Sequence, residues 1–186
     1  QKWYAQYISI ARTNDALSRI VEVSEGEYPK KTIREAEMRF LRAHFYFELK
    51  ILYKHIPYVD ETIATEAYIN VSNVEYSSGE LWDKIVAEFR FAAENLPDNN
   101  EDKGRANKGM AKAYLAKALL YSAYEQDERH NVTNINKIKL EEVVALCNEL
   151  GGRYAMAVYF AENYLCATDN GPESVFVVPH LHSYGT

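Results

Sequence analysis

Apolar residues recur every three or four positions in five separate stretches of the chain, which is the spacing of amphipathic helices. The stretches predict helices over residues 2–23, 32–53, 81–96, 106–125 and 138–150. The second stretch is apolar nearly all round, and such a helix is usually buried between others. Residues 58–75 show no clear period, whereas 98–105 and 126–137 are polar. These three segments are therefore predicted to be connections.

Local sequence also marks the ends of the predicted helices. Thr32 and Ser77 are each followed three positions later by a glutamate, which is the pattern of a capping box. Gly26 suits a left-handed C-cap after the first helix. Gly151-Gly152 is a strong stop signal after the fifth.

Near the C-terminus the pattern changes, because Ser174–Val178 reads as a short buried strand between Pro172 and Pro179. The predicted fold class is therefore mainly all-α. We expect stacked helical hairpins of tetratricopeptide type, with a short strand and an irregular segment near the C-terminus. Trp82, with apolar residues three and seven positions later, is typical of that style, although no strict 34-residue repeat is present.

Composition changes the picture mainly by exclusion. The 186 residues are 47% hydrophobic and 26% charged, as in ordinary globular proteins. The net charge is −6, and the basic run Lys137–Lys139 is too short to form a nucleic-acid-binding face. No run of 18 apolar residues predicts a transmembrane helix.

The motifs of common catalytic and metal sites are missing, including the Glu-x-x-His pair of helical di-iron proteins. His180 and His182 lack a visible third ligand, and the segment Asp127–His130 is interpreted as a solvated turn. Cys147 and Cys166 are interpreted as small apolar residues. We predict no catalytic residue, cofactor or metal, and we expect that the protein is not an enzyme. Glu35 and Arg39 form an i,i+4 pair that supports a helix.

Aromatic residues are abundant, with fifteen tyrosines and two tryptophans. Aromatic rings can stack on sugar rings, but they also pack protein cores. Trp3 and Trp82 lie on helical stripes and are predicted to be core residues. The tyrosines in predicted loops or ends are free to contact a ligand; they are Tyr58, Tyr68, Tyr76 and Tyr184.

The second predicted helix and the turn after it resemble a known family signature. Residues 34–49, with Tyr53 and Ile56–Val59, resemble the SusD/RagB family of nutrient-binding lipoproteins of the Bacteroidetes outer membrane. Further segments agree in order: 3–14, 88–97, 104–121, 151–154 and 173–176. Two positions depart from the family pattern. Lys54-His55 stands where the family has Gly-Gly, and His44 occupies a position that is normally aromatic.

The resemblance implies that residues 1–186 are a single helical scaffold region and an internal fragment of a longer protein. It implies non-catalytic binding of an oligo- or polysaccharide, or in some members of peptides, by an outward-facing lipoprotein of the outer membrane. The implied partner is a SusC-like TonB-dependent transporter, and the implied lipid anchor lies outside this chain. No glycan-binding residue is assigned. The matched positions are expected to be scaffold: Arg42, Gly104, Arg105, Tyr154 and Phe176.

Two alternatives stay open at this point. A tetratricopeptide-like adaptor would bind a protein or peptide in a concave groove lined by its repeat helices. An enzyme of unrecognised type would need a pocket with convergent titratable groups.

Overall fold

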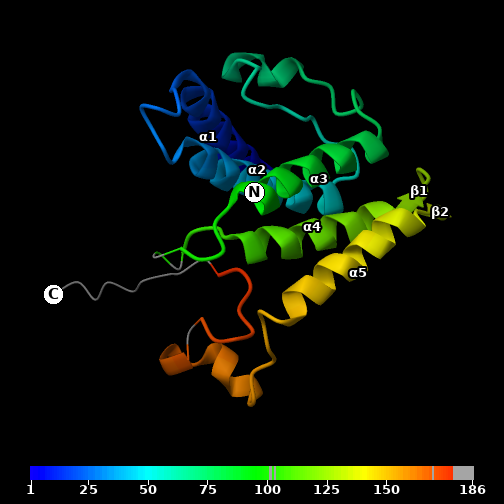
Figure 1. Ribbon diagram of the computed structural model, residues 1–186. Helices are drawn as coiled ribbons and strands as arrows, with labels where there is room; N and C mark the ends of the chain where they lie inside the picture. Colours follow the sequence, from blue (N-terminus) through cyan, green and yellow to red (C-terminus); the bar gives the residue numbers. More distant parts are fainter. Residues whose placement is uncertain (101, 103, 169, 178–186) are drawn as a thin grey trace.

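The computed structural model describes residues 1–100, 102, 104–168 and 170–177 (Figure 1). Within these ranges five α-helices form the fold, close to their predicted bounds. They are α1 (Lys2–Glu22), α2 (Lys31–Leu52), α3 (Ser78–Asn95), α4 (Lys108–Ala123) and α5 (Lys137–Gly151). The predicted mainly helical fold class is confirmed.

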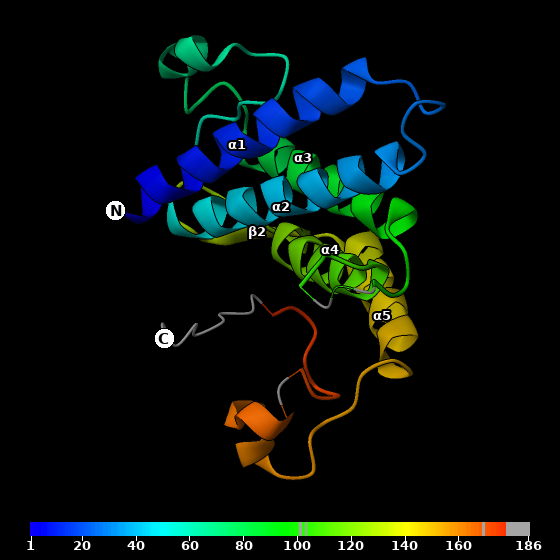
Figure 2. The same cartoon turned by 90° about the vertical axis from the view of Figure 1, so that its left-hand side faces the viewer.

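Each helix packs chiefly on the next one along the chain, from α1 through α5 (Figures 1 and 2). The result is a stack of helical hairpins, as predicted. The second helix, α2, contacts α1, α3 and α4, so its nearly continuous apolar surface is explained by partners on several sides. None of the helices in the described ranges is both long and apolar enough to cross a bilayer.

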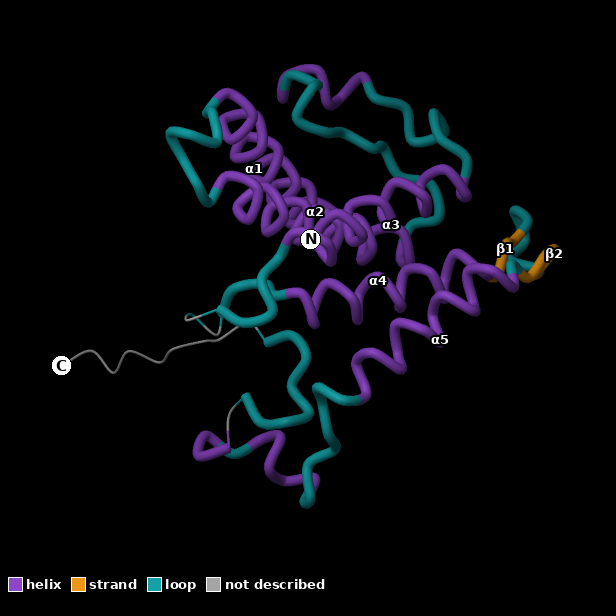
Figure 3. The backbone as a smooth tube through the Cα atoms, in the orientation of Figure 1, coloured by secondary structure: helices purple, strands orange, loops and turns teal. Residues whose placement is uncertain are grey.

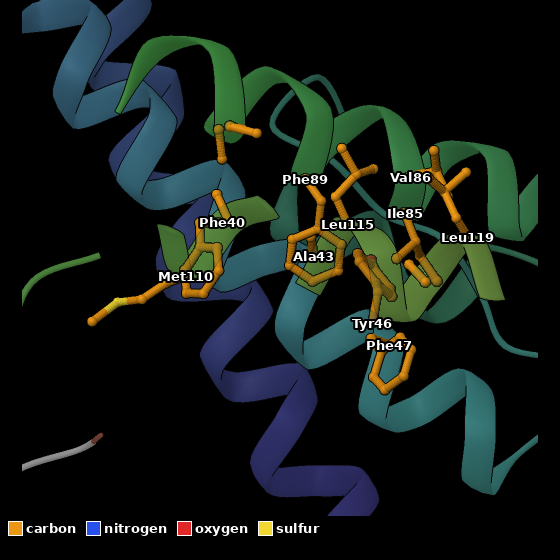
Figure 4. Packing of buried hydrophobic residues seen from close by; sticks show 14 of the residues in the cluster. Phe40, Ala43, Tyr46, Phe47, Ile85, Val86, Phe89, Met110, Leu115 and Leu119 are labelled. Atoms are coloured by element: carbon orange, nitrogen blue, oxygen red, sulfur yellow. The ribbon is translucent and has the colours of Figure 1, made fainter. Parts of the chain in front are cut away.

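The hydrophobic core lies where α2, α3 and α4 meet, and Figure 4 shows the side chains that these helices contribute to it. Phe40 of α2 lies edge-on to Phe89 of α3, with ring centroids 5.7 Å apart. Both rings are fully buried, and removing such a ring typically costs about 3–5 kcal/mol. Other members are Ala43, Tyr46, Phe47, Ile85, Val86, Met110, Leu115 and Leu119.

The two predicted capping boxes have different outcomes. At Ser77 the box forms, because its Oγ accepts from the Glu80 N–H at 3.3 Å and Glu80 Oε2 accepts from the Ser77 N–H at 2.8 Å. The prediction at Thr32 is wrong. Helix α2 begins one residue earlier, and the Thr32 hydroxyl donates to Glu25 instead.

Of the two glycine positions predicted to end helices, one prediction is wrong and one is confirmed. Gly26 does not form a left-handed cap, since α1 already ends at Glu22 and none of the described glycines has a positive φ. Gly151 does end α5, as predicted.

The strands lie elsewhere than predicted. β1 (Tyr124–Gln126) and β2 (Val132–Ile135) form an antiparallel hairpin between α4 and α5 (Figure 3). Asp127 holds its turn by accepting from the N–H groups of Arg129 and Asn131. The predicted strand at 174–178 is wrong for residues 174–177, which are irregular with a bend at Val175 and Phe176, and Val178 lies outside the described residues.

Three short 3₁₀ helices occupy the longer connections in the described ranges. The α2–α3 connection contains η1 (Thr65–Asn70), and the segment after α5 contains η2 (Phe160–Tyr164) and η3 (Cys166–Thr168). The segment after α5 leaves the stack and returns to it at Phe176, whose ring lies 5.5 Å from that of Phe40. This return explains why Phe176 packs on the core rather than joining a sheet.

Candidate functional site

The loop tyrosines that could have contacted a ligand mostly serve packing. Tyr58 is only 6% exposed and stacks on Tyr46 at 4.6 Å, so the prediction that it is free is wrong. Tyr68 is half-buried and accepts a hydrogen bond from Asn14 at 2.8 Å. Tyr76 lies edge-on to Tyr58. Tyr184 lies outside the described residues.

The two tryptophans are less buried than predicted. Trp3 is 37% exposed on α1, where it contacts Tyr7 and Tyr53, because the N-terminal turn of α1 extends past the core. Trp82 is half-buried at the edge of the core, with its ring 5.7 Å from that of Phe47. Its remaining surface lines a hollow.

Arg42 is a scaffold residue, as the resemblance implied. It is 1% exposed, and its guanidinium donates to both carboxylate oxygens of Glu88 at 2.8 and 3.1 Å. It also donates to Glu61 and, at 2.8 Å, to Asn14. Burial disfavours its charge, but the pKa of Arg42 is nevertheless raised because Glu88 and Glu61 surround it. The cluster therefore joins α1, α2, α3 and the α2–α3 connection.

Other matched positions also hold elements together. Arg105, in the turn before α4, donates to Glu37 of α2 at 2.8 Å. Although burial opposes its ionisation, hydrogen bonds from Arg105 and Arg34 hold the pKa of Glu37 below its usual range. Gly104 donates to Asp102 within the same turn. Arg105 therefore connects segments that lie far apart in the sequence, whereas Gly104 stabilises the turn itself.

Tyr154 approaches α4 so closely that a Cβ on Gly109 would lie 2.4 Å from its hydroxyl oxygen. His44, which replaces the usual aromatic residue of the family, lies edge-on to Tyr114 and Phe176 at 5.2 and 5.6 Å. Burial lowers the pKa of His44. The histidine therefore packs as a neutral ring.

A hollow of about 680 Å³ opens at one end of the stack. It is bounded by the C-terminal end of α2, the N-terminal end of α3, the last turn of α4 and the β1–β2 hairpin. The Ser77 capping box fixes where α3 begins, and the hairpin closes the side that the helices leave open. Secondary structure from four parts of the chain thus forms one concave surface.

One wall of the hollow is aromatic. The rings of Trp82 and Tyr121 lie 5.9 Å apart, and Phe47 supports both from the core at 5.7 and 5.4 Å. Tyr121 is 46% exposed, and Tyr124 on β1 is 40% exposed. Rings that are held by the core and open on one side can stack on the C–H face of a ligand.

The floor of the hollow holds a lysine in a buried position. Lys50 of α2 is 5% exposed, and its Nζ donates to the Lys54 carbonyl oxygen at 2.7 Å and to Ser78 Oγ at 2.8 Å. The same Nζ lies 5.7 Å from the centre of the Trp82 ring. Burial, together with the charge of Lys54, lowers the pKa of Lys50 to about 8.

Lys54 lies at the rim, and His55 follows it in the chain; the two stand where the resembling family has two glycines. His55 Nε2 lies 3.0 Å from a carboxylate oxygen of Glu128, and Lys54 Nζ lies 3.6 Å from the same oxygen. Hydrogen bonding to His55 lowers the pKa of Glu128. The departure from the family pattern therefore ties the end of α2 to the hairpin turn.

Among the residues that the structure describes, the remaining candidates form no group that could hold a metal. The Asp127–His130 segment is a solvated turn, as predicted. Cys147 and Cys166 are interpreted from the sequence as small apolar residues, and in the structure both are free and exposed rather than packed in the core. For Cys147 the reason is that α5 buries only Leu146. His180 and His182 lie outside the described residues, and the described ranges contain no group of three metal-ligating side chains.

Sequence reasoning missed the hollow, although one signal was present. Lys50 continues the row of Ala43, Tyr46 and Phe47 at spacings of three and four, and these three residues are all buried. A lysine on the buried face of a helix is unusual and usually has a partner or a role. The hairpin that completes the site gave no comparable signal.

Comparison with known proteins supports the same fold. Residues 1–120 match the family model for SusD-like proteins, described as starch-binding and associating with the outer membrane. The SusD-like protein P2 of Formosa agariphila is 29% identical over 118 residues, which are 63% of this chain and 23% of that protein.

Solved structures agree over a longer range. A SusD-like protein from Bacteroides fragilis superposes with a TM-score of 0.74 at 24% identity, covering 94% of this chain and 32% of that one. A laminarin-binding SusD-like protein gives the same TM-score at 22% identity, covering 94% and 36%. At these identities the structures establish a shared fold. The chain spans between about a quarter and about a third of the length of these relatives.

Proposed function

Because the chain belongs to the SusD-like family, whose model matches residues 1–120, we propose that it captures carbohydrate without cleaving it. The carbohydrate-contacting surface is the hollow beside Trp82. The observation that carries this assignment is the pairing of partly exposed, core-supported aromatic rings with hydrogen-bonding groups in one concave surface. Sugars present C–H faces to rings and hydroxyl groups to polar side chains, and this surface offers both partners.

The wider role is inferred from the family. We propose that residues 1–186 act as one helical scaffold region of a protein at the outer-membrane surface. That protein would pass its carbohydrate to a TonB-dependent transporter. Co-purification of such a transporter with the full-length protein from detergent-solubilised outer membranes would support this role. Recovery of the protein from the cytoplasm without a transporter would contradict it.

The binding proposal is tested by calorimetric titration with a panel of soluble polysaccharides that includes laminarin. Binding of at least one glycan without new reducing ends is expected. Tyr121→Ala should weaken this binding several-fold, up to about tenfold, since a stacked aromatic ring contributes about 0.5–1.5 kcal/mol beyond its buried area. Tyr121 is nearly half exposed, so the variant is expected to fold.

Tyr159→Ala is the matched control, because Tyr159 is 70% exposed and lies after α5, outside the hollow. This variant should bind like the parent protein. If Tyr121→Ala and the parent protein bind the glycan with equal affinity, the hollow is not the carbohydrate-binding site. Retention of peptides but of no glycan would favour a peptide-binding adaptor.

A further inference from the structure

We propose that the hollow selects sugars that carry an anionic substituent, a carboxylate or a sulfate ester, and that Lys50 recognises this group. The inference rests on the proposed function, because it names the class of carbohydrate that the same site takes. It is carried by the environment of the Lys50 ammonium.

Lys50 is a buried cation without a carboxylate partner. Its two hydrogen bonds go to a carbonyl oxygen and a hydroxyl oxygen, both of them neutral. Among the described residues no carboxylate oxygen lies within 4.0 Å of its Nζ. An ammonium has three donors, so one remains for a ligand. Burying a charge without an opposite charge is costly, and an anion bound in the hollow would relieve that cost.

The other charged groups around the hollow are arranged differently. Lys54 already donates to the Asp127 carbonyl oxygen and lies beside Glu128, which His55 also contacts. Glu125 lies on the exposed strand β1. Among the described residues, the ammonium of Lys50 is thus the buried lining charge that has no ion-pair partner within 4.0 Å.

The position of Lys50 fits a stacked sugar. Its Nζ lies beside the first turn of α3, where backbone N–H groups also favour negative charge. It lies 5.7 Å from the centre of the Trp82 ring, and Trp82 forms the aromatic wall with Tyr121. A sugar ring packed on that wall would bring an anionic substituent to the ammonium. Since the chain carries a net charge of −6, general electrostatic attraction does not favour anions.

The test compares oligosaccharides in matched pairs, by calorimetry at pH 7 and fixed ionic strength. One arm uses oligogalacturonate and its fully methyl-esterified form, and a second uses oligoglucuronate and its methyl ester. A third arm uses a sulfated galactan oligosaccharide and its desulfated form. In at least one arm the acidic member should bind about tenfold more tightly, the gain expected from one charge-assisted hydrogen bond. The arms distinguish a carboxylate from a sulfate.

Lys50→Met should abolish this preference, so that the acidic and the neutral member of a pair bind with equal affinity. A purely structural role for Lys50 would weaken both members equally. Lys50→Arg should retain part of the preference. Lys30→Met is the matched control, because Lys30 is exposed and lies at the other end of α2, about 30 Å away.

The outcomes separate the two proposals. Equal affinity for both members of every pair, or a preference that persists in Lys50→Met, would overturn the recognition of an anion. In that case carbohydrate capture would still stand, provided that Tyr121→Ala weakens it. Failure of every member, acidic and neutral, to bind would overturn the carbohydrate site and this inference together.

Discussion

Helix α2 contains two buried cations that differ in whether an opposite charge lies beside them. Arg42 lies in the middle of the stack, and its guanidinium contacts Glu88, Glu61 and Asn14. Lys50 lies two turns later, at the floor of the hollow, and contacts only neutral oxygen atoms among the described residues. Accordingly, the pKa of Arg42 is raised and that of Lys50 is lowered to about 8.

The difference separates scaffold from site. A buried charged group that finds its hydrogen-bond partners within the fold fixes the relative positions of the elements that supply those partners. A buried charge without an opposite charge reduces stability, and proteins place such groups where they bind or react. Burial alone would assign both residues to the core, whereas their partners distinguish them.

The largest expected effect is the loss of the Arg42 charge. Arg42→Met leaves Glu88 buried without its main partner, so we expect a loss of about 3–5 kcal/mol in the free energy of unfolding. Urea denaturation followed by circular dichroism measures it. Arg19→Met removes an exposed pair with Asp15 and should change stability by less than about 1 kcal/mol. A similar small loss for Arg42→Met would contradict its role in the scaffold.

Lys50→Met should have the opposite sign. Below pH 8 the parent carries a charged, buried Lys50, and the variant should be more stable by about 1–3 kcal/mol. Between about pH 8 and the ordinary value of 10.5, the unfolded chain binds a proton that the folded chain does not, so the stability of the parent rises with pH. The advantage of the variant should therefore shrink over this range.

Urea titrations of both proteins from pH 7 to pH 10 measure that difference. Buried tyrosines such as Tyr46 have raised pKa values and also affect stability at high pH, but they are present in both proteins and cancel. The neighbouring charges of Lys54 and Glu128 are likewise shared. A difference that stays constant with pH would show that Lys50 is not the titrating group.

The smallest expected effect on stability concerns the N-terminal cap of α3, which lies at the mouth of the hollow. Ser77→Ala removes the cap of α3 at the mouth of the hollow and should cost about 1 kcal/mol. Thr32→Ala changes the same sequence pattern at a place where no box forms, and it should cost less than about 0.5 kcal/mol. Thermal unfolding of the two variants compares them directly. Equal losses would mean that Ser77 acts through something other than its cap.

These pairs of residues also show which structural features the local sequence can predict. Helical periodicity located the five α-helices that lie in the described ranges, because a helix buries residues that lie three and four positions apart. It could not distinguish Thr32 from Ser77, since a capping box depends on where the preceding chain arrives. It also could not find the β1–β2 hairpin, whose strands are only three and four residues long and lack a buried face.

The sequence itself determined the order and the faces of the helices and the stop at Gly151, because each depends on neighbours a few residues away. The ion pair of Arg42 with Glu88 joins residues 46 positions apart, and only the packing of α2 on α3 brings them together. The hollow likewise exists only where the ends of α2, α3 and α4 meet the hairpin. Tertiary structure therefore decided which buried charge is neutralised within the fold and which remains available to a ligand.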